Sequence, residues 1–87
     1  MVAVIEVRVE GGSAFSVRVD GRSFAVTAAE ALVQELGAPD QLSLVRGSFE
    51  FLLEREPASS ILPRFDLGVI ARYFPEFARE LPRYLAP

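Results

Sequence analysis

The stretch DQLSLVRGSFEFLLERE, residues 40–56, carries the longest helical pattern in the chain and determines how the rest can pack. At about 100° per residue, five apolar side chains share about a third of the helix circumference, the width of a normal core-facing stripe. The stripe consists of Leu42, Val45, Phe49, Leu52 and Leu53. Leu44 and Phe51 lie outside it and form a second apolar patch, which adjoins the stripe at Ser48. A helix with two apolar sides needs two surfaces to pack against. These are the strands upstream and the tail downstream, or the second is a partner subunit.

The segment before this helix begins with a predicted β-hairpin. Apolar and charged residues alternate strictly over residues 5–10, which is typical of a half-buried strand. If Val9 pairs with Phe15 across the Gly-Gly-Ser loop, the apolar faces of both strands match. Glu6 then lies opposite Arg18, which is a favourable cross-strand pair.

A third strand continues the sheet after an Asp-Gly turn, with Phe24 and Val26 on the apolar face. Residues 1–27 are therefore predicted to form a three-stranded antiparallel β-meander with one buried face. Val2 and Val4 add apolar side chains to the otherwise polar face of the first strand. This makes the first strand a candidate edge for pairing with another chain.

Residues 28–56 are predicted to form a pair of helices. Thr27 followed by Glu30 has the spacing of a capping box, in which each side chain accepts a hydrogen bond from a free backbone N–H. Gly37 suits the left-handed position after the end of the first helix. The second helix is expected to run to Glu56, because the following proline restricts the residue before it.

The tail, residues 57–87, is divided by five prolines but is too apolar for a solvated linker. Asp66 is expected to cap one short helix and Pro75 to begin another. We expect this helical tail to dock on the chain's own core or on a partner. The predicted fold class is α+β, as a single domain of residues 1–87 made of the β-meander, the helix pair and the Pro-segmented helical tail.

Composition favours self-association. A chain of 87 residues makes one small domain, and domains of this size bury only about 60–65% of their unfolded surface. A hydrophobic content of 51% is difficult to hide in so small a domain. We therefore expect a homodimer or a larger homo-oligomer.

Several chemistries lack their usual side chains. The sequence contains no Cys, His or Lys, which removes thiolate metal sites, the commonest general base and Schiff-base chemistry. We expect no enzyme activity and no cofactor. The net charge of −3 gives no global attraction to nucleic acid or to an anionic membrane. The N-terminus is not a signal peptide and no apolar run reaches membrane-spanning length, so a soluble, cytoplasmic protein is expected.

Polar groups of possible catalytic use have simpler interpretations. Glu50 and Glu54 lie one helical turn apart and could act as an acid and base pair, but a solvated face with an Arg46–Glu50 ion pair is favoured. The serines at 59–60 fit a turn, since nothing evident would activate a serine nucleophile. The arginines and aromatic residues of the tail could bind RNA, but acidic neighbours offset the charge, and Glu76 is expected to pair with Arg72.

Aromatic and large apolar side chains are the usual anchors of protein interfaces. On this basis seven residues are predicted to bind a protein partner. They are Leu44, Phe51, Phe65, Ile70, Tyr73, Phe74 and Phe77.

The run LVRGSFEFLLEREPASSILPRFDLGVIARYFPEF, residues 44–77, resembles a group of small uncharacterised bacterial proteins that share a pattern like SFEFLLEREPxxSILxxFDLxxIxxYFPE. The resemblance covers about two fifths of the chain. It implies that the long helix and the tail form one module, and it implies no particular activity.

The order of strand, helix and helix over residues 22–55 also resembles ribbon-helix-helix proteins, whose dimers place a two-stranded ribbon in the DNA major groove. Two departures count against this resemblance. The outward positions of the ribbon would be Ser23, Ala25 and Thr27, which offer few contacts to bases, and two additional strands precede it.

The sequence therefore leaves two main hypotheses for function. The preferred one is a homodimeric, non-enzymatic protein-protein interaction module. The alternative is an antitoxin-like regulator that binds DNA through a ribbon-helix-helix portion. An enzyme that uses only carboxylates and arginines is the least favoured of the possibilities.

Overall fold

A computed structural model describes residues 4–85 of the chain. Within this range three strands come first and two α-helices follow. The tail then contains a fourth strand, two short α-helices and three short 3-10 helices (η). The strands are β1 (Ile5–Gly11), β2 (Ala14–Val19), β3 (Arg22–Thr27) and β4 (Arg64–Asp66). The α-helices are α1 (Glu30–Leu36), α2 (Gln41–Leu53), α3 (Ile70–Tyr73) and α4 (Phe77–Glu80). The 3-10 helices are η1 (Ala58–Ser60), η2 (Leu67–Val69) and η3 (Leu81–Tyr84). The α+β fold class is confirmed.

The predicted hairpin register is confirmed. Val9 pairs with Phe15 and Glu6 pairs with Arg18 in the antiparallel β1–β2 ladder. The register shifts between Val9 and Gly11, where Gly11 has a φ of 136°. This bulge ends the regular part of β1 at the Gly-Gly loop. Val2, which was predicted to lie on the edge of the sheet, is outside the described residues.

A fourth strand joins the sheet, and the sequence did not predict it. β4 pairs in parallel with β3, which gives the strand order β1-β2-β3-β4. The Ala25 N–H donates to the Pro63 carbonyl at 2.8 Å, and the Thr27 hydroxyl donates to Asp66 Oδ1 at 2.6 Å. β3 therefore has a neighbouring strand on each side.

The predicted capping box is wrong. α1 begins at Glu30 after Ala29, and no side chain caps it. Thr27 is still in β3, where its hydroxyl bonds to Asp66, so it is not available to the helix. The predicted helix end is confirmed, because Gly37 has a φ of 72° and its N–H reaches the last turn of α1.

The long helix α2 begins as expected and ends earlier than expected. The Asp40 side chain accepts a hydrogen bond from the Ser43 N–H at 2.7 Å, which caps the first turn. Regular α-helix ends at Leu53 rather than at Glu56, because the amides of Glu54 and Arg55 bond three residues back in a tighter turn.

One side of α2 packs on the sheet. Phe49 is fully buried, with its ring centroid 5.3 Å from that of Phe24 in β3 and 6.0 Å from that of Phe65 in β4. Val45 and Leu52 are also buried. Leu42 does not belong to this stripe as predicted, because 45% of it remains exposed.

The other side of α2 packs on the tail of the same chain. Phe51 is fully buried, and its ring makes edge-on contacts with three aromatic rings of the tail, those of Phe74, Phe77 and Tyr84. Gly47 allows this close approach, because a Cβ there would lie 3.3 Å from the Tyr84 carbonyl oxygen. Both apolar sides of α2 are thus covered from within one chain.

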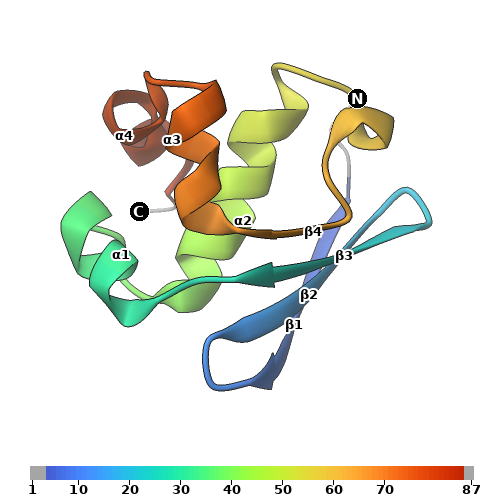
Figure 1. Cartoon of the computed structure of the whole chain (residues 1–87), viewed down its shortest axis with the longest axis horizontal. Helices are drawn as coiled ribbons and strands as arrows, with labels where there is room; N and C mark the ends of the chain where they lie inside the picture. Colours follow the sequence, from blue (N-terminus) through green and yellow to red (C-terminus); the bar gives the residue numbers. More distant parts are fainter. Residues whose placement is uncertain (1–3, 86–87) are drawn as a thin grey trace.

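Figure 1 shows the resulting arrangement, with the helices gathered on one side of the sheet. In this view α2 passes behind β4. α3 and α4 lie at the upper left, away from the β1–β2 hairpin at the bottom (Figure 1). The side chains of Phe15, Val17 and Val19 in β2 are buried under the helices. The alternate residues Ser16 and Arg18 point to the other face of the sheet.

Candidate functional site

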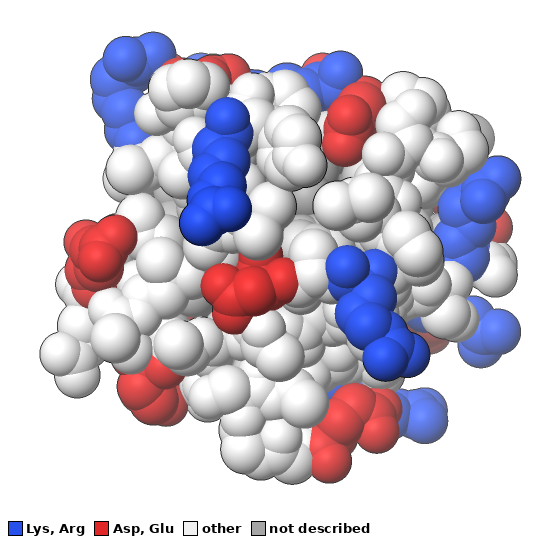
Figure 2. All heavy atoms as spheres, in the orientation of Figure 1, with Lys and Arg blue, Asp and Glu red and all other residues white. Residues whose placement is uncertain are grey.

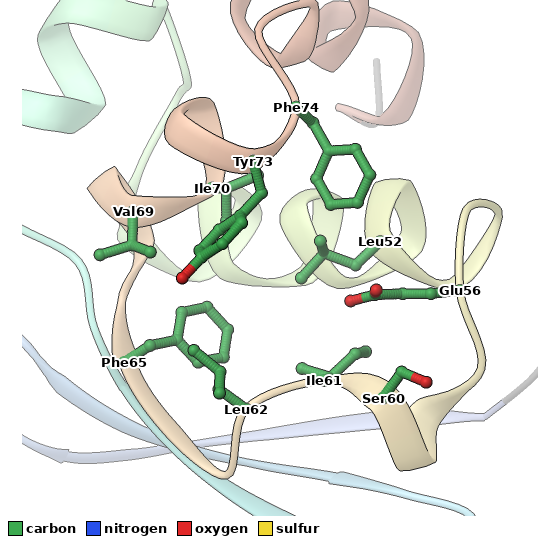
Figure 3. Close-up of a pocket in the computed structure, with 10 residues that line it drawn as sticks. All are labelled: Leu52, Glu56, Ser60, Ile61, Leu62, Phe65, Val69, Ile70, Tyr73 and Phe74. Carbon is green, nitrogen blue, oxygen red and sulfur yellow. The ribbon is translucent and has the colours of Figure 1, made fainter.

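A groove of about 360 Å³ opens beside β4, between the C-terminal end of α2, the η1 segment and α3 (Figure 3). Its walls come from segments that are far apart in the sequence. The lining residues are Leu52, Glu56, Ser60, Ile61, Leu62, Phe65, Val69, Ile70, Tyr73 and Phe74.

The groove is apolar in its floor and on its rim. Ile61 and Ile70 are buried in the floor, whereas Leu62 is 49% exposed and Tyr73 is 68% exposed at the rim. Figure 3 shows these side chains directed toward a common space, with Phe65 between them. Large apolar side chains with this degree of exposure around a hollow are characteristic of a binding surface.

Polar groups in the groove are few. Glu56 comes from the turn after α2, and its carboxylate points into the space (Figure 3). Over residues 4–85, no side chain forms a hydrogen bond or ion pair with this carboxylate. Ser60 lies nearby, and the Tyr73 hydroxyl is the third polar group. The groove therefore combines apolar walls with one acidic end.

Arg55 holds the α3–α4 side of the groove in place. Its guanidinium lies 3.6 Å from the ring centroid of Phe51 and its Nε donates to Glu76 Oε2 at 3.1 Å. It also donates to the Tyr84 hydroxyl at 3.5 Å, and Tyr84 in turn donates to Glu54 at 2.7 Å. This cluster ties the end of α2 to the tail, next to the turn that carries the groove's acidic residue.

The Arg55 contact also contributes to a lowered pKa at Glu76. A hydrogen bond from its own backbone N–H, and then the one from Arg55, hold the pKa of the Glu76 carboxyl below its ordinary value. The predicted Arg72–Glu76 pair is therefore replaced by Arg55–Glu76. The predicted Arg46–Glu50 pair is also absent from the ion pairs of the described chain.

Four of the seven residues predicted to bind a partner line this groove. Phe65, Tyr73 and Phe74 form its accessible walls, and Ile70 forms part of its floor. The remaining three do not line the groove. Leu44, Phe51 and Phe77 are buried in the core of the chain itself.

The sequence did not single out Glu56, Leu62 or Val69 as groove residues. Leu62 lies in the loop that leads to β4, so its position depends on a strand that was not predicted. The only sequence signal for it was the apolar Ile-Leu pair in a proline-rich segment.

Groups with catalytic potential are dispersed. The serines of η1 lie in a turn, as predicted, with the Ser60 N–H donating to the Pro57 carbonyl at 2.9 Å. Glu54 accepts from Tyr84 and shares no cluster with Glu50. Among residues 4–85, no three acidic side chains gather in a way that could hold a metal ion.

The charged side chains follow no single pattern on the face shown in Figure 2, where basic and acidic groups are interspersed among uncharged ones. No helix in the described part of the chain is long and apolar enough to cross a membrane.

Comparisons with known proteins find no family model, curated protein or solved structure that matches this chain. The resemblances to small bacterial proteins and to ribbon-helix-helix proteins stay predictions.

Proposed function

We propose that this protein is a non-enzymatic protein-protein interaction module that works as a homodimer and binds an apolar segment of a partner protein in the groove beside β4. The observation that carries the proposal is the groove itself, with Leu62 and Tyr73 exposed over an apolar floor. Tyrosine and other aromatic side chains around such a hollow are the usual energetic centre of a protein interface.

The groove also indicates the chemistry of the bound segment. Its volume is near the lower end of the range for ligand sites, about 300–1,000 Å³, so it accommodates only a few side chains. Glu56 contributes a carboxylate at one end that no side chain of residues 4–85 pairs with, which favours a cationic group there. We infer a short segment with two or more bulky apolar residues beside an Arg or Lys.

Selection from a random heptapeptide display library on the full-length protein tests this proposal. We expect the selected peptides to share bulky apolar residues and a basic residue, and to bind in solution as synthetic peptides. On a Glu56→Lys variant, the same selection should yield an acidic residue in place of the basic one.

Two exposed leucines provide a matched pair of variants for the peptide measurements. Leu62→Asp, in the groove, should reduce affinity for the selected peptides by at least about tenfold, which corresponds to about 1.4 kcal/mol. Leu42→Asp, at a similarly exposed site on α2 outside the groove, should leave affinity unchanged. Equal effects of the two variants, or no shared sequence among selected peptides, would contradict the proposal.

The strand order gives no support to the DNA-binding alternative. In a ribbon-helix-helix dimer the strand before the helix pair needs a free edge to pair with its counterpart. Here β3 lies between β2 and β4. Ser23 and Ala25 face outward from a central strand of the sheet instead.

A further inference from the structure

β1 forms one edge of the sheet and is open along its outer side. It is seven residues long, and in the described part of the chain no other strand pairs with that side. A row of unpaired backbone N–H and C=O groups is a template for another strand. Neither proline nor lysine blocks it within β1, and its bulge lies at the last residue, Gly11.

Apolar side chains remain uncovered along this edge. Val9 is 55% exposed although it lies on the same face as the buried residues Ile5 and Phe15. Val4, just before the strand, is 72% exposed. A neighbouring strand on the outer side of β1 would cover Val9.

The charges of β1 are complementary to those of a second β1 strand. In an antiparallel pair of two β1 strands centred on Val7, each Glu6 lies opposite Arg8 of the partner subunit. Each Ile5 then lies opposite Val9 of the partner subunit. Neither Glu6 nor Arg8 forms an ion pair in the described chain, so both are available for this contact. Opposite charges on directly facing residues favour a strand pair, whereas like charges disfavour it.

We propose that the homodimer forms by antiparallel pairing of β1 with β1 of a second copy, centred on Val7. The two-fold axis then runs perpendicular to the sheet, so that the two four-stranded sheets form one continuous sheet with the helices of both copies on the same side. Val9 of each copy packs beside Ile5 of the partner subunit on the helix-covered face. This inference rests on the homodimer of the proposed function and names its interface.

Charge reversal at two positions tests this register. Arg8→Glu places like charges opposite each other at both symmetric contacts, as does Glu6→Arg. We expect each variant alone to have a dimer dissociation constant at least about tenfold higher than the unchanged protein by sedimentation equilibrium. Mixed in equal amounts, the two variants should form a heterodimer, because each acidic residue again faces an arginine.

Controls separate loss of pairing from loss of folding. Arg8 lies opposite the uncharged Ser16 within the chain, so Arg8→Glu introduces no like-charge pair there. Glu6→Arg does face Arg18 of β2, so its loss of dimerisation counts for the interface only where the mixture with Arg8→Glu restores a dimer. Arg22→Glu, at the start of the interior strand β3, should leave dimerisation unchanged. Circular dichroism should show that all variants unfold cooperatively.

Three results would overturn the inference: a monomeric unchanged protein at all concentrations, single variants that dimerise as the unchanged protein does, or a mixture that fails to form heterodimers. None of these results affects the peptide measurements on the groove. Failure of the β1 interface can therefore be distinguished from failure of the groove proposal.

Discussion

The two edges of the sheet differ in how they are closed. β4 is three residues long, follows Pro63 and is fixed at its end by the bond between Thr27 and Asp66. Short strands and prolines are devices that prevent an edge from pairing further. β1 at the opposite edge is seven residues long and has no such device before Gly11. The difference indicates that strand pairing with another chain is possible at β1 and blocked at β4.

The apolar side chains around the two edges also differ in what they can bind. The apolar side chains beside β4 surround a groove, which suits the side chains of a short segment. Those beside β1 border a strand edge that has no neighbouring strand among residues 4–85, which suits another strand. Because β1 and β4 are at opposite edges of the sheet, both contacts can form at once.

Phe51→Ala should have the largest effect and act on the β4 side. The Phe51 ring is fully buried and contacts three rings of the tail, including Phe74 in the groove wall. We expect the free energy of unfolding, measured with urea, to fall by about 3–5 kcal/mol. The groove peptides should lose affinity under conditions where the variant remains folded.

A loss below about 1 kcal/mol would mean that the tail is not held by this ring. Phe65→Ala is the comparison, because Phe65 is only partly buried in the groove wall. It should lower stability less than Phe51→Ala while reducing peptide affinity in a protein that remains folded.

Asp66→Ala should have an intermediate effect that is confined to the β4 edge. The Asp66 carboxylate accepts hydrogen bonds from the Thr27 hydroxyl and from the Gly68 N–H at 2.9 Å. We expect a loss of about 1–2 kcal/mol of stability. The Ala25 amide, which donates to the Pro63 carbonyl, should exchange with solvent faster.

Glu10→Ala is the matched control at the β1 edge, where Glu10 accepts a hydrogen bond from the Ser16 hydroxyl at 2.8 Å. This variant should leave exchange of the Ala25 amide unchanged. If both variants accelerate that exchange equally, the two edges are not independent.

Acid should loosen the tail through Glu76. A carboxyl with a depressed pKa contributes stability above its unfolded pKa, and this contribution is lost as the pH falls through the folded value. For Glu76 the loss begins near its ordinary pKa of 4.5 and continues below it. As the pH falls from the ordinary pKa through the lower folded value, the free energy of unfolding should decline more steeply in the unchanged protein than in Glu76→Gln. Identical slopes for the two proteins would exclude the Arg55–Glu76 contact as a source of stability.

Sequence patterns predicted the parts of the fold that local chemistry determines. Alternation and a tight loop place Val9 opposite Phe15, and single side chains or a missing Cβ determine the helix ends at Gly37, Asp40 and Asp66. Each of these features involves residues close together in the chain.

The errors arise where distant partners compete with local ones. Thr27 has a local partner in the capping-box pattern, but its hydroxyl bonds to Asp66, 39 positions away. Glu76 likewise pairs with Arg55, 21 positions away, rather than with Arg72. β4 is too short for a detectable alternation, and its parallel pairing with β3 is set by the packing of the whole tail.

The candidate site was predictable only in part, because residue type can be read from the sequence but contacts between distant segments cannot. Aromatic residues of the tail, such as Tyr73 and Phe74, stand out by residue type. An apolar pattern cannot show whether the partner of Leu44 or Phe77 is another protein or the chain's own tail. Glu56 became part of the site only because the turn after α2 folds toward β4.

Hydrogen exchange read residue by residue at low and high protein concentration tests the difference between the two edges most directly. We expect the outward-facing amides of β1 to exchange more slowly as concentration rises, because they donate to a second β1 strand. The amides of β4 should not change. Unchanged exchange at β1, or slowing at β4 instead, would contradict the assignment of β1 as the open edge through which two copies pair.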